Sequence, residues 1–209
     1  MSLTINYSKK SAKSSSNNKI VFVDEKFNTQ NIKNLISISE LNYINDLLKN
    51  GDLKKNIHIF NVSSKKKIIL ISLKKNQKSN ETEKGGAKLT DFLNSEGAGA
   101  VHIISDTISI NLKSDAIYEF LHGMRLKSYS FDRYKSKKDS KILKVNMISS
   151  KKFNKKIYDK FKAIELGVNY TKDLVSEPGN ILHPDEYAKR LTQLKKIGLK
   201  VSVYNEKQL

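Results

Sequence analysis

Cysteine is absent from this 209-residue sequence, and proline occurs only at Pro178 and Pro184. Without cysteine the chain has no disulfide and no thiolate ligand, which excludes zinc fingers, iron–sulfur clusters and cysteine nucleophiles. Long apolar runs are missing too, since the longest aliphatic stretch, residues 68–71, is far shorter than the roughly 20 residues that cross a bilayer. The first residues also lack the basic stretch and apolar core of a secretory signal. We therefore expect a soluble, cytoplasmic protein without a membrane segment.

Arginine is scarce although the chain is strongly basic. The formal charge is +18 and the isoelectric point is near 9.8, which points to an anionic partner such as nucleic acid or an acidic membrane face. Of the 39 cationic residues, however, only Arg125, Arg133 and Arg190 carry the planar guanidinium that suits base reading and bidentate phosphate binding. The excess is lysine, accompanied by many Asn and Ile, and this composition favours a codon bias spread over solvated faces. Both interpretations stay open.

Recognisable catalytic motifs are missing as well. The sequence contains no His-Glu-x-x-His, Gly-x-Ser-x-Gly or phosphate-cradling Gly-x-x-x-x-Gly-Lys pattern. Three of the four histidines lie in predicted core elements and are interpreted as structural residues: His58, His102 and His122. His183 with Asp185 and Glu186 offers three kinds of metal ligand, but acids in the first turn of a helix are explained by the helix dipole. We expect no metal site in this chain.

Apolar residues recur with strand and helix periods along most of the sequence. Strands are predicted at residues 4–7, 19–23, 57–62, 67–73, 101–104, 140–147 and 200–204, and helices at residues 39–48, 85–93, 114–124, 151–176 and 184–196. Polar loops are predicted at residues 8–18 and 76–86. The run at 68–71 is apolar on both faces, which indicates a central strand covered by helices on each side. This alternation predicts an α/β fold with a mixed sheet between helix layers.

Each predicted helix has one apolar face. The first is expected to begin at a serine cap, Ser39, with Leu41, Ile44, Leu47 and Leu48 inward. Ser114 and Asp115 are expected to cap the third, and Tyr187 to point inward on the last. The long helix at 151–176 carries a narrow seam for a single partner, formed by Ile157, Phe161, Ile164, Val168, Thr171 and Val175. Its first turns are rich in lysine, the unfavourable charge for that end of a helix.

Both prolines lie within residues 169–191, where one helix pattern ends and the next begins. Pro178 is followed by Gly179, and Pro184 opens a helix whose first turn is acidic. These features predict a domain junction. The chain also stops at Leu209, just after the last predicted strand, so we expect it to be a truncated part of a longer protein.

The junction and a segment before it carry a family pattern. The matching residues are Lys172-Asp173-Leu174, Glu177-Pro178-Gly179-Asn180, Pro184 and Ala188, together with Ser130-Phe131-Asp132-Arg133-Tyr134-Lys135-Ser136-Lys137-Lys138. Together with the order of strands and helices, these motifs resemble the leucine (cytosol) aminopeptidase family over nearly the whole chain. The first forty residues match only in their pattern of elements, without a motif. The resemblance implies three parts: a macro-domain-like N-terminal domain at 1–150, an interdomain linker helix at 151–176, and the start of the peptidase domain at 177–209.

The resemblance also implies a function for the parent protein. Members of the family are cytosolic metallo-exopeptidases that release N-terminal, preferably leucine-like residues, with two divalent ions (Mn or Zn) held in the C-terminal domain. The family's Asn-Thr-Asp-Ala-Glu-Gly-Arg segment would lie beyond Leu209, so no catalytic or metal position is assigned here and the chain alone is expected to be inactive. Its implied partners are its own catalytic domain, a peptide substrate and other copies in a homo-hexamer, where the N-terminal domain shapes assembly and substrate access.

Two alternatives come from other classes of function. Some bacterial members of the family bind DNA, and a weak, sequence-independent nucleic-acid surface is predicted at Lys135, Lys137, Lys138, Lys151, Lys152, Lys155 and Lys156. Macro domains bind ADP-ribose through glycine-rich loops at helix N-termini, and Gly85-Gly86 and Gly97-Ala98-Gly99 are the candidate loops. Glycine pairs more often serve turns and close packing.

Overall fold

The computed structural model describes residues 2–9, 18–137 and 142–208. Contacts divide the chain into two compact units, Met1–Glu165 and Leu166–Leu209, so that the boundary falls inside one long helix. The first unit contains the sheet.

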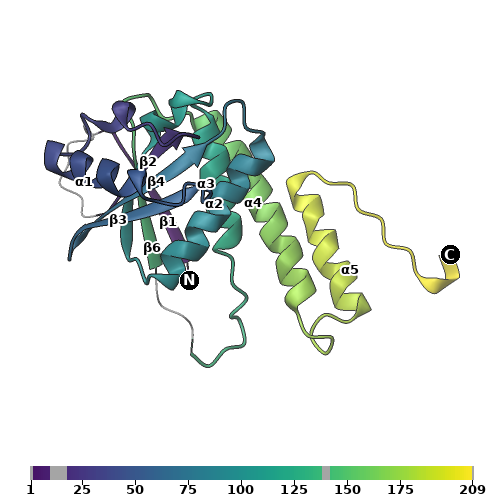
Figure 1. The fold of residues 1–209 in the computed structure, drawn as a ribbon. Coiled ribbons are helices and arrows are strands. Elements are labelled where there is room, and N and C mark those ends of the chain that lie inside the picture. Colours follow the sequence, from purple (N-terminus) through teal and green to yellow (C-terminus); the bar gives the residue numbers. More distant parts are fainter. Residues whose placement is uncertain (1, 10–17, 138–141, 209) are drawn as a thin grey trace. The chain divides into compact units, whose positions relative to one another are not determined.

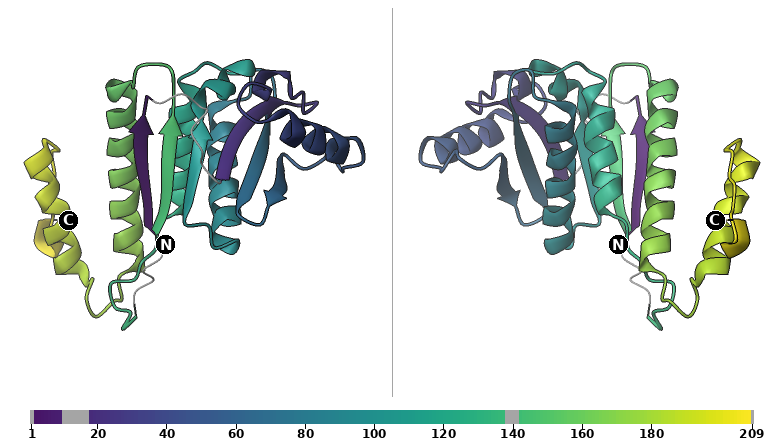
Figure 2. Two further views of the ribbon diagram at one scale, coloured as in Figure 1. Left: turned by 90° about the vertical axis from the view of Figure 1, so that its left-hand side faces the viewer. Right: turned by 90° about the vertical axis from the view of Figure 1, so that its right-hand side faces the viewer.

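Six strands form a single mixed sheet in the first unit (Figure 1). They are β1 (Ser2–Ser8), β2 (Asn18–Asp24), β3 (Ile57–Ser63), β4 (Lys66–Leu73), β5 (Ala100–Ile104) and β6 (Ile142–Ile148). Their order is β1-β6-β5-β2-β4-β3, and every neighbouring pair is parallel except β3 with β4. The side views show β1 next to β6 at one edge (Figure 2). The predicted mixed α/β fold is confirmed. Residues 140 and 141 of the strand predicted at 140–147, and residues 10–17 of the loop predicted at 8–18, lie outside the described residues.

The strands next to the sheet centre are buried on both faces. In β4, Ile69 and Ile71 belong to one core cluster, whereas Ile68 and Leu70 belong to another on the opposite face. Helices α2 (Ser79–Ser95), α3 (Ala116–Lys127) and the start of α4 (Lys155–Ser176) cover the first cluster. Helix α1 (Ile38–Lys49) and the short 3-10 helix η1 (Gln30–Ile32) cover the second. The predicted two-sided burial is therefore confirmed, although β4 lies second from the edge of the sheet.

Helix α1 (Ile38–Lys49) begins earlier than predicted. The cap is Ser37 rather than Ser39, because the Ser37 hydroxyl accepts from the Glu40 amide at 3.3 Å and the Glu40 carboxylate accepts from the Ser37 amide at 2.9 Å. Ile44 is fully buried, but Leu47 is 44% exposed, so its predicted inward position is wrong. Ile44 is the residue of α1 that enters the second core cluster, with Leu41 and Leu48 packed against it.

Helix α2 (Ser79–Ser95) begins inside the stretch predicted as a loop. The predicted loop at 76–86 ended at Gly85-Gly86, which were also expected to open the helix, but both glycines lie well inside α2. Helix α2 lies beside α3 (Ala116–Lys127) (Figure 1). A Cβ on Gly86 would lie 1.9 Å from the Phe120 carbonyl oxygen, and one on Gly123 would lie 1.9 Å from that of Glu83. The glycines therefore serve close helix packing, not a turn.

The 3-10 helix η2 (Ser105–Ile110) occupies the stretch after β5. Asp115 precedes α3, but neither it nor Ser114 makes a side-chain cap bond; backbone bonds close this first turn instead, such as the Tyr118 amide to the Asp115 carbonyl at 3.0 Å. The side-chain cap predicted there is wrong. The predicted apolar face of α3 is confirmed, and Phe120 and Met124 are fully buried.

Helix α4 (Lys155–Ser176) confirms the N-terminal half of the predicted seam. Ile157 and Phe161 pack against the first core cluster, whereas Ile164 is 42% and Val175 is 81% exposed. Those two positions were predicted inward and are not. The packed face instead includes the polar side chain of Glu165, which the apolar pattern could not indicate.

The second unit contains the end of α4, α5 (Pro184–Thr192) and the 3-10 helices η3 (Gln193–Ile197) and η4 (Glu206–Gln208). Arg190 donates to Glu177 at 2.9 Å and to Glu186 at 3.0 Å, while the Tyr170 hydroxyl donates to the Arg190 carbonyl at 3.0 Å. The helix predicted at 184–196 becomes 3-10 from Gln193, and Tyr187 is 44% exposed rather than inward.

The strand predicted at 200–204 is wrong for this structure. Those residues have no strand assignment, and among the described residues no neighbouring strand pairs with them, so alternation alone did not suffice. No helix among the described residues is long and apolar enough to cross a bilayer.

Candidate functional site

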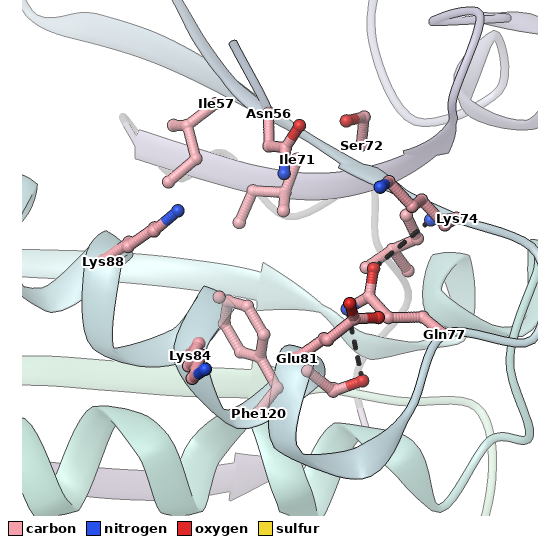
Figure 3. Close-up of a pocket in the computed structure, with 13 residues that line it drawn as sticks. Asn56, Ile57, Ile71, Ser72, Lys74, Gln77, Glu81, Lys84, Lys88 and Phe120 are labelled. Carbon is pink, nitrogen blue, oxygen red and sulfur yellow. Dashed lines mark hydrogen bonds between the residues drawn. The ribbon is translucent and has the colours of Figure 1, made fainter.

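A cavity of about 220 Å³ lies at the carboxyl end of β4, between the start of β3 and the first turns of α2 (Figure 3). In open α/β sheets ligands bind beyond the carboxyl ends of the strands, and this position follows that rule. The cavity is lined by Asn56, Ile57, Ile71, Ser72, Leu73, Lys74, Gln77, Glu81, Thr82, Lys84, Gly85, Lys88 and Phe120.

A short turn positions the wall between β4 and α2. The Gln77 amide donates to the Lys74 carbonyl at 3.2 Å, and the Lys74 amide donates to the Gln77 side-chain oxygen at 3.3 Å. Asn76, within the turn, has a φ of 55°, which asparagine adopts more readily than most residues. The Gln77 side chain then donates to the buried Thr82 hydroxyl at 3.3 Å (Figure 3). These bonds fix the polar wall.

The floor of the cavity is apolar. Ile71, Leu73 and Phe120 belong to the first core cluster, and Ile57 of the edge strand packs against it. Gly85 carries no side chain over this floor, and a Cβ there would lie 3.4 Å from the Phe120 ring. Ile71 and Leu73 are each 2% exposed and Phe120 is fully buried, so this floor offers little surface to solvent.

Four charged side chains surround this floor: Lys74, Glu81, Lys84 and Lys88 (Figure 3). None of them forms an ion pair with another of the residues that the structure describes. On neighbouring surfaces of the same unit lysines do pair, as Lys67 does with Glu96 at 2.7 Å. The cavity thus combines an apolar floor with three ammonium groups and one carboxylate.

A second hollow lies beyond the carboxyl ends of β1 and β6. Two adjoining spaces of about 130 and 440 Å³ share Met147, Ser149, Lys151 and Lys152 as lining residues. Asp106 organises the loop after β6, because its carboxylate accepts from the Ser149 hydroxyl at 2.9 Å and the Ser150 amide at 2.8 Å. The two lysines are exposed beside it.

The predicted nucleic-acid lysines fall into two groups. Lys135 and Lys137 precede β6 and are exposed, whereas Lys138 lies outside the described residues. The second group, Lys151, Lys152, Lys155 and Lys156, follows the same strand. β6 has seven residues at about 3.3 Å each, so roughly 20 Å of strand separates the groups. Lys155 also pairs with Asp159. Of the described lysines, Lys151 and Lys152 line the same hollow beyond β6.

The histidines occupy separate places. Burial lowers the pKa of His122, which lies against the Phe161 ring at 4.9 Å, and burial together with Lys19 lowers that of His102. His58 approaches the Lys55 carbonyl at 3.0 Å, and His183 precedes α5 without a side-chain cap bond. Among the described residues, no three His, Cys, Asp or Glu side chains form a group able to hold a metal ion.

The glycines predicted as ligand loops do not form a cradle together. Gly85 and Gly86 lie within α2, which contradicts the loop prediction for them. At the carboxyl ends of β2 and β5 the space is occupied by η2, where the Thr107 hydroxyl accepts from the Phe22 amide at 2.9 Å and Ile108 is fully buried.

A partly buried polar cluster beside α4 could not be predicted from the apolar pattern. Arg125 donates to Glu165 and to the Tyr158 hydroxyl, both at 3.0 Å. Burial opposes the charge of Arg125, but these bonds outweigh it and raise its pKa, while burial raises the pKa of the neighbouring Tyr7 phenol well above its ordinary value. The sequence feature that could have indicated this cluster is Arg125 itself, because arginine is rare in this chain and this one lies on a core helix.

The sheet order, the covering helices and the pocket at a strand end define a mixed α/β domain. A sequence model of the cytosol aminopeptidase family, N-terminal domain, matches residues 20–138. The chain therefore belongs to the cytosol aminopeptidase family, and the match lies in its N-terminal domain.

Individual proteins agree with this assignment. A probable cytosol aminopeptidase of Phytoplasma australiense is 36% identical over 115 residues, which cover 54% of this chain and 23% of that protein. The matched part of the chain thus spans about a quarter of the curated relative. A mutant of tomato leucine aminopeptidase has the same fold with a TM-score of 0.72 at 14% identity, covering 99% of this chain and 45% of that one. The bottromycin maturation enzyme BotP, in complex with Mn, has a similar fold with a TM-score of 0.63 at 12% identity. That match covers 93% of this chain and 39% of BotP.

Proposed function

We propose that this chain is the N-terminal, non-catalytic portion of a cytosolic leucyl aminopeptidase. The family match over residues 20–138 carries the proposal. The fold likeness to tomato leucine aminopeptidase supports it, because it extends over 99% of this chain but only 45% of that enzyme. The parent protein would release N-terminal amino acids from peptides in the cytoplasm.

The proposed parent enzyme uses two divalent ions, Mn or Zn, which would activate water and polarise the scissile carbonyl. The Mn complex of BotP, a protein of similar fold, is consistent with a metal in the parent. Since no three suitable side chains converge among the described residues, we assign no metal ligand and derive no catalytic step here. We place both ions in a C-terminal catalytic domain.

For the domain itself we propose a role in assembly and substrate access within a homo-hexamer. Its architecture is proposed to be macro-domain-like over residues 1–150, with 151–176 as the interdomain helix and 177–209 as the start of the peptidase domain. The partners would be the catalytic domain and the other copies of the chain.

The test compares the 209-residue chain with a longer protein in which a cytosol aminopeptidase catalytic domain follows it. With Mn²⁺, the longer protein should release leucine from a chromogenic leucyl amide, and the 209-residue chain should not. Light scattering should find a hexamer of the longer protein that is lost when residues 1–150 are deleted. Hydrolysis by the short chain, or none by the longer one, would reject the assignment.

A second candidate function is weak, sequence-independent nucleic-acid binding. The observation that favours it is the exposed group of Lys151, Lys152 and Lys156 at one end of β6. The candidate loops for ADP-ribose binding do not precede a helix: Gly85 and Gly86 pack within α2, and Gly97-Ala98-Gly99 leads from α2 into strand β5.

A further inference from the structure

We infer that residues 166–169, one turn of α4, form a hinge at which the helix bends between two anchored halves. This turn is called the hinge segment below. The compact first unit ends just before it, at Glu165, and the residues after it contact the second unit. The hinge is a property of this chain and does not require the proposed function.

The first half of α4 is held by the first unit. Ile157 and Phe161 pack against the first core cluster. One turn after Phe161, the Glu165 carboxylate accepts from Arg125 of α3 at 3.0 Å, and these two side chains are only 19% and 16% exposed. An ion pair with so little exposure fixes both the rotation and the register of α4 as far as Glu165.

The last part of α4 is held by α5 instead. The Tyr170 hydroxyl donates to the Arg190 carbonyl at 3.0 Å. The Arg190 guanidinium donates to the carboxylate of Glu177, just beyond the end of α4, at 2.9 Å. Leu174 is the buried residue of this part of the helix. Helix α4 is therefore anchored on both sides of the hinge segment, by a different unit on each side.

Packing does not explain the glycine in the hinge segment. Leu166 is 62% exposed, and a Cβ on Gly167 would meet nothing within 4 Å. The glycines at the contact of α2 and α3 differ, since a Cβ on Gly86 or Gly123 would lie 1.9 Å from a carbonyl oxygen. At an open helix position such as Gly167, what glycine contributes is backbone freedom.

The residues around this glycine also form helices poorly. Five consecutive residues rank below alanine, leucine, lysine and glutamate as helix formers: Gly167, Val168, Asn169, Tyr170 and Thr171. The Thr171 hydroxyl donates to the Gly167 carbonyl at 3.1 Å, a type of bond that often bends helices. The Asn169 side-chain oxygen is buried without a hydrogen-bond partner among the described residues, and opening the turn would let water reach it. These features lower the cost of bending α4 at this turn.

A helix that is anchored at both ends and weak between them bends at its weak turn. In the proposed parent protein the hinge segment lies between the N-terminal domain and the start of the peptidase domain, so these two parts would move against each other there. This consequence rests on the proposed function. The hinge itself is tested on the 209-residue chain by measurements that involve no peptidase activity, so either proposal can fail without the other.

Amide hydrogen exchange followed by NMR locates the weak turn. In an α-helix the amides of residues 170–173 bond to the carbonyl groups of residues 166–169. We expect these amides to exchange faster than those of residues 159–163 and faster than those of residues 174–176. Gly167→Ala should slow their exchange about fivefold, the factor that separates glycine from alanine in a helix. Equally fast exchange over residues 170–176 would mean that the whole second half of α4 frays, which would overturn the inference.

Distances between spin labels measure the bending, and a chain without cysteine allows labelling at introduced cysteines alone. The exposed positions Lys113 and Lys160 lie in the first unit, and the exposed positions Val175 and Lys196 lie in the second. By double electron–electron resonance, the pair Lys113→Cys with Lys160→Cys and the pair Val175→Cys with Lys196→Cys should each give a narrow distance distribution. Lys113→Cys with Lys196→Cys spans the hinge segment and should give a broad one, which Gly167→Ala should narrow.

Gly85→Ala is the matched control, because it also replaces a helical glycine by alanine, but in α2. It should leave all three distributions and the exchange of residues 170–173 unchanged. A spanning pair as narrow as the pairs within each unit, or a spanning distribution that Gly167→Ala does not change, would overturn the hinge. A broad distribution between Val175 and Lys196 would also overturn it, because the motion would then lie beyond α4.

Discussion

Gly86 of α2 and Phe120 of α3 lie so close together that a Cβ atom on Gly86 would fall 1.9 Å from the Phe120 carbonyl oxygen. The contact is reciprocal, because a Cβ on Gly123 of α3 would lie 1.9 Å from the carbonyl oxygen of Glu83 of α2. Two helices can approach to this distance only where neither carries a side chain at the contact. The glycines therefore set the spacing of the helix pair that covers the first core cluster.

Replacing Gly86 by alanine should destabilise the domain. The added methyl would meet backbone atoms, which cannot rotate away, so α2 and α3 would have to separate and lose core packing. We expect the free energy of unfolding to fall by about 2–4 kcal/mol. Urea unfolding followed by circular dichroism measures this change.

Gly85→Ala is the matched control in the same turn of α2. Its methyl would lie 3.4 Å from a Phe120 ring carbon, a side-chain contact that can adjust. Because alanine is the better helix former, the change should be neutral or stabilise by up to about 1 kcal/mol. Equal losses for the two alanine variants would contradict the packing role of Gly86.

Removing the charge of Glu165, the partly buried partner of Arg125, should also weaken the domain. The Arg125 and Glu165 side chains are only 16% and 19% exposed, so Glu165→Gln would leave a largely buried cation with a weaker acceptor. We expect a loss of roughly 2–3 kcal/mol in the free energy of unfolding. A double-mutant cycle with Arg125→Gln should give a clear coupling energy between the two residues.

The exposed pair of Lys127 and Asp91 provides the comparison. Its side chains are 46% and 59% exposed at a distance of 3.0 Å, so Asp91→Asn should cost at most about 1 kcal/mol. A larger cost there than for Glu165→Gln would show that burial does not determine these effects.

Acidification should destabilise the domain through His122. Burial is the main cause of its lowered pKa, which Glu83 and Glu165 oppose and Arg125 reinforces. The unfolded chain, with a histidine pKa of about 6.5, therefore binds the proton more readily than the native state does. The contribution of neutral His122 to the free energy of unfolding is complete above pH 6.5. It is lost as the pH falls below that value, by up to about 1.4 kcal/mol per pH unit.

Unfolding by urea at several pH values between 7.5 and 5 measures this dependence. His122→Gln should flatten the curve, and His102→Gln should do so as well, because burial and Lys19 lower the pKa of His102. An unchanged slope in the His122 variant would contradict the assignment.

Much of the sheet was predictable because its strands are short apolar runs. In β2, for example, Phe22 and Val23 face different core clusters, and a run that is apolar at every position indicates such burial. The start of α2 was not predictable in the same way. Gly85-Gly86 has the composition of a turn, and only the carbonyl group of Phe120, contributed by another helix, shows why glycine is required there.

The candidate pocket could not be predicted from the sequence for a similar reason. Its floor joins Ile57, Ile71 and Phe120 from three separate elements, and its charged rim lay partly in a stretch predicted as a loop. The lysines predicted to bind nucleic acid were grouped because they lie close together in the sequence, but closeness in sequence did not place them on one surface. Lys137 and Lys151 are near neighbours by number, but β6 extends between them.

DNA binding, if it uses these lysines, should therefore depend on the two groups unequally. Neutralising Lys151, Lys152 and Lys156 together removes adjacent charges from one surface, whereas neutralising Lys135 and Lys137 changes a site roughly 20 Å of strand away. Binding to mixed-sequence duplex DNA should be weaker than about 1 µM near 150 mM salt and should decrease steeply with added salt. The triple glutamine variant should reduce the salt slope by about 2–3, and the double variant should have less effect. Nanomolar binding to one sequence at that salt concentration, or equal effects of both variants, would contradict a single non-specific surface after β6.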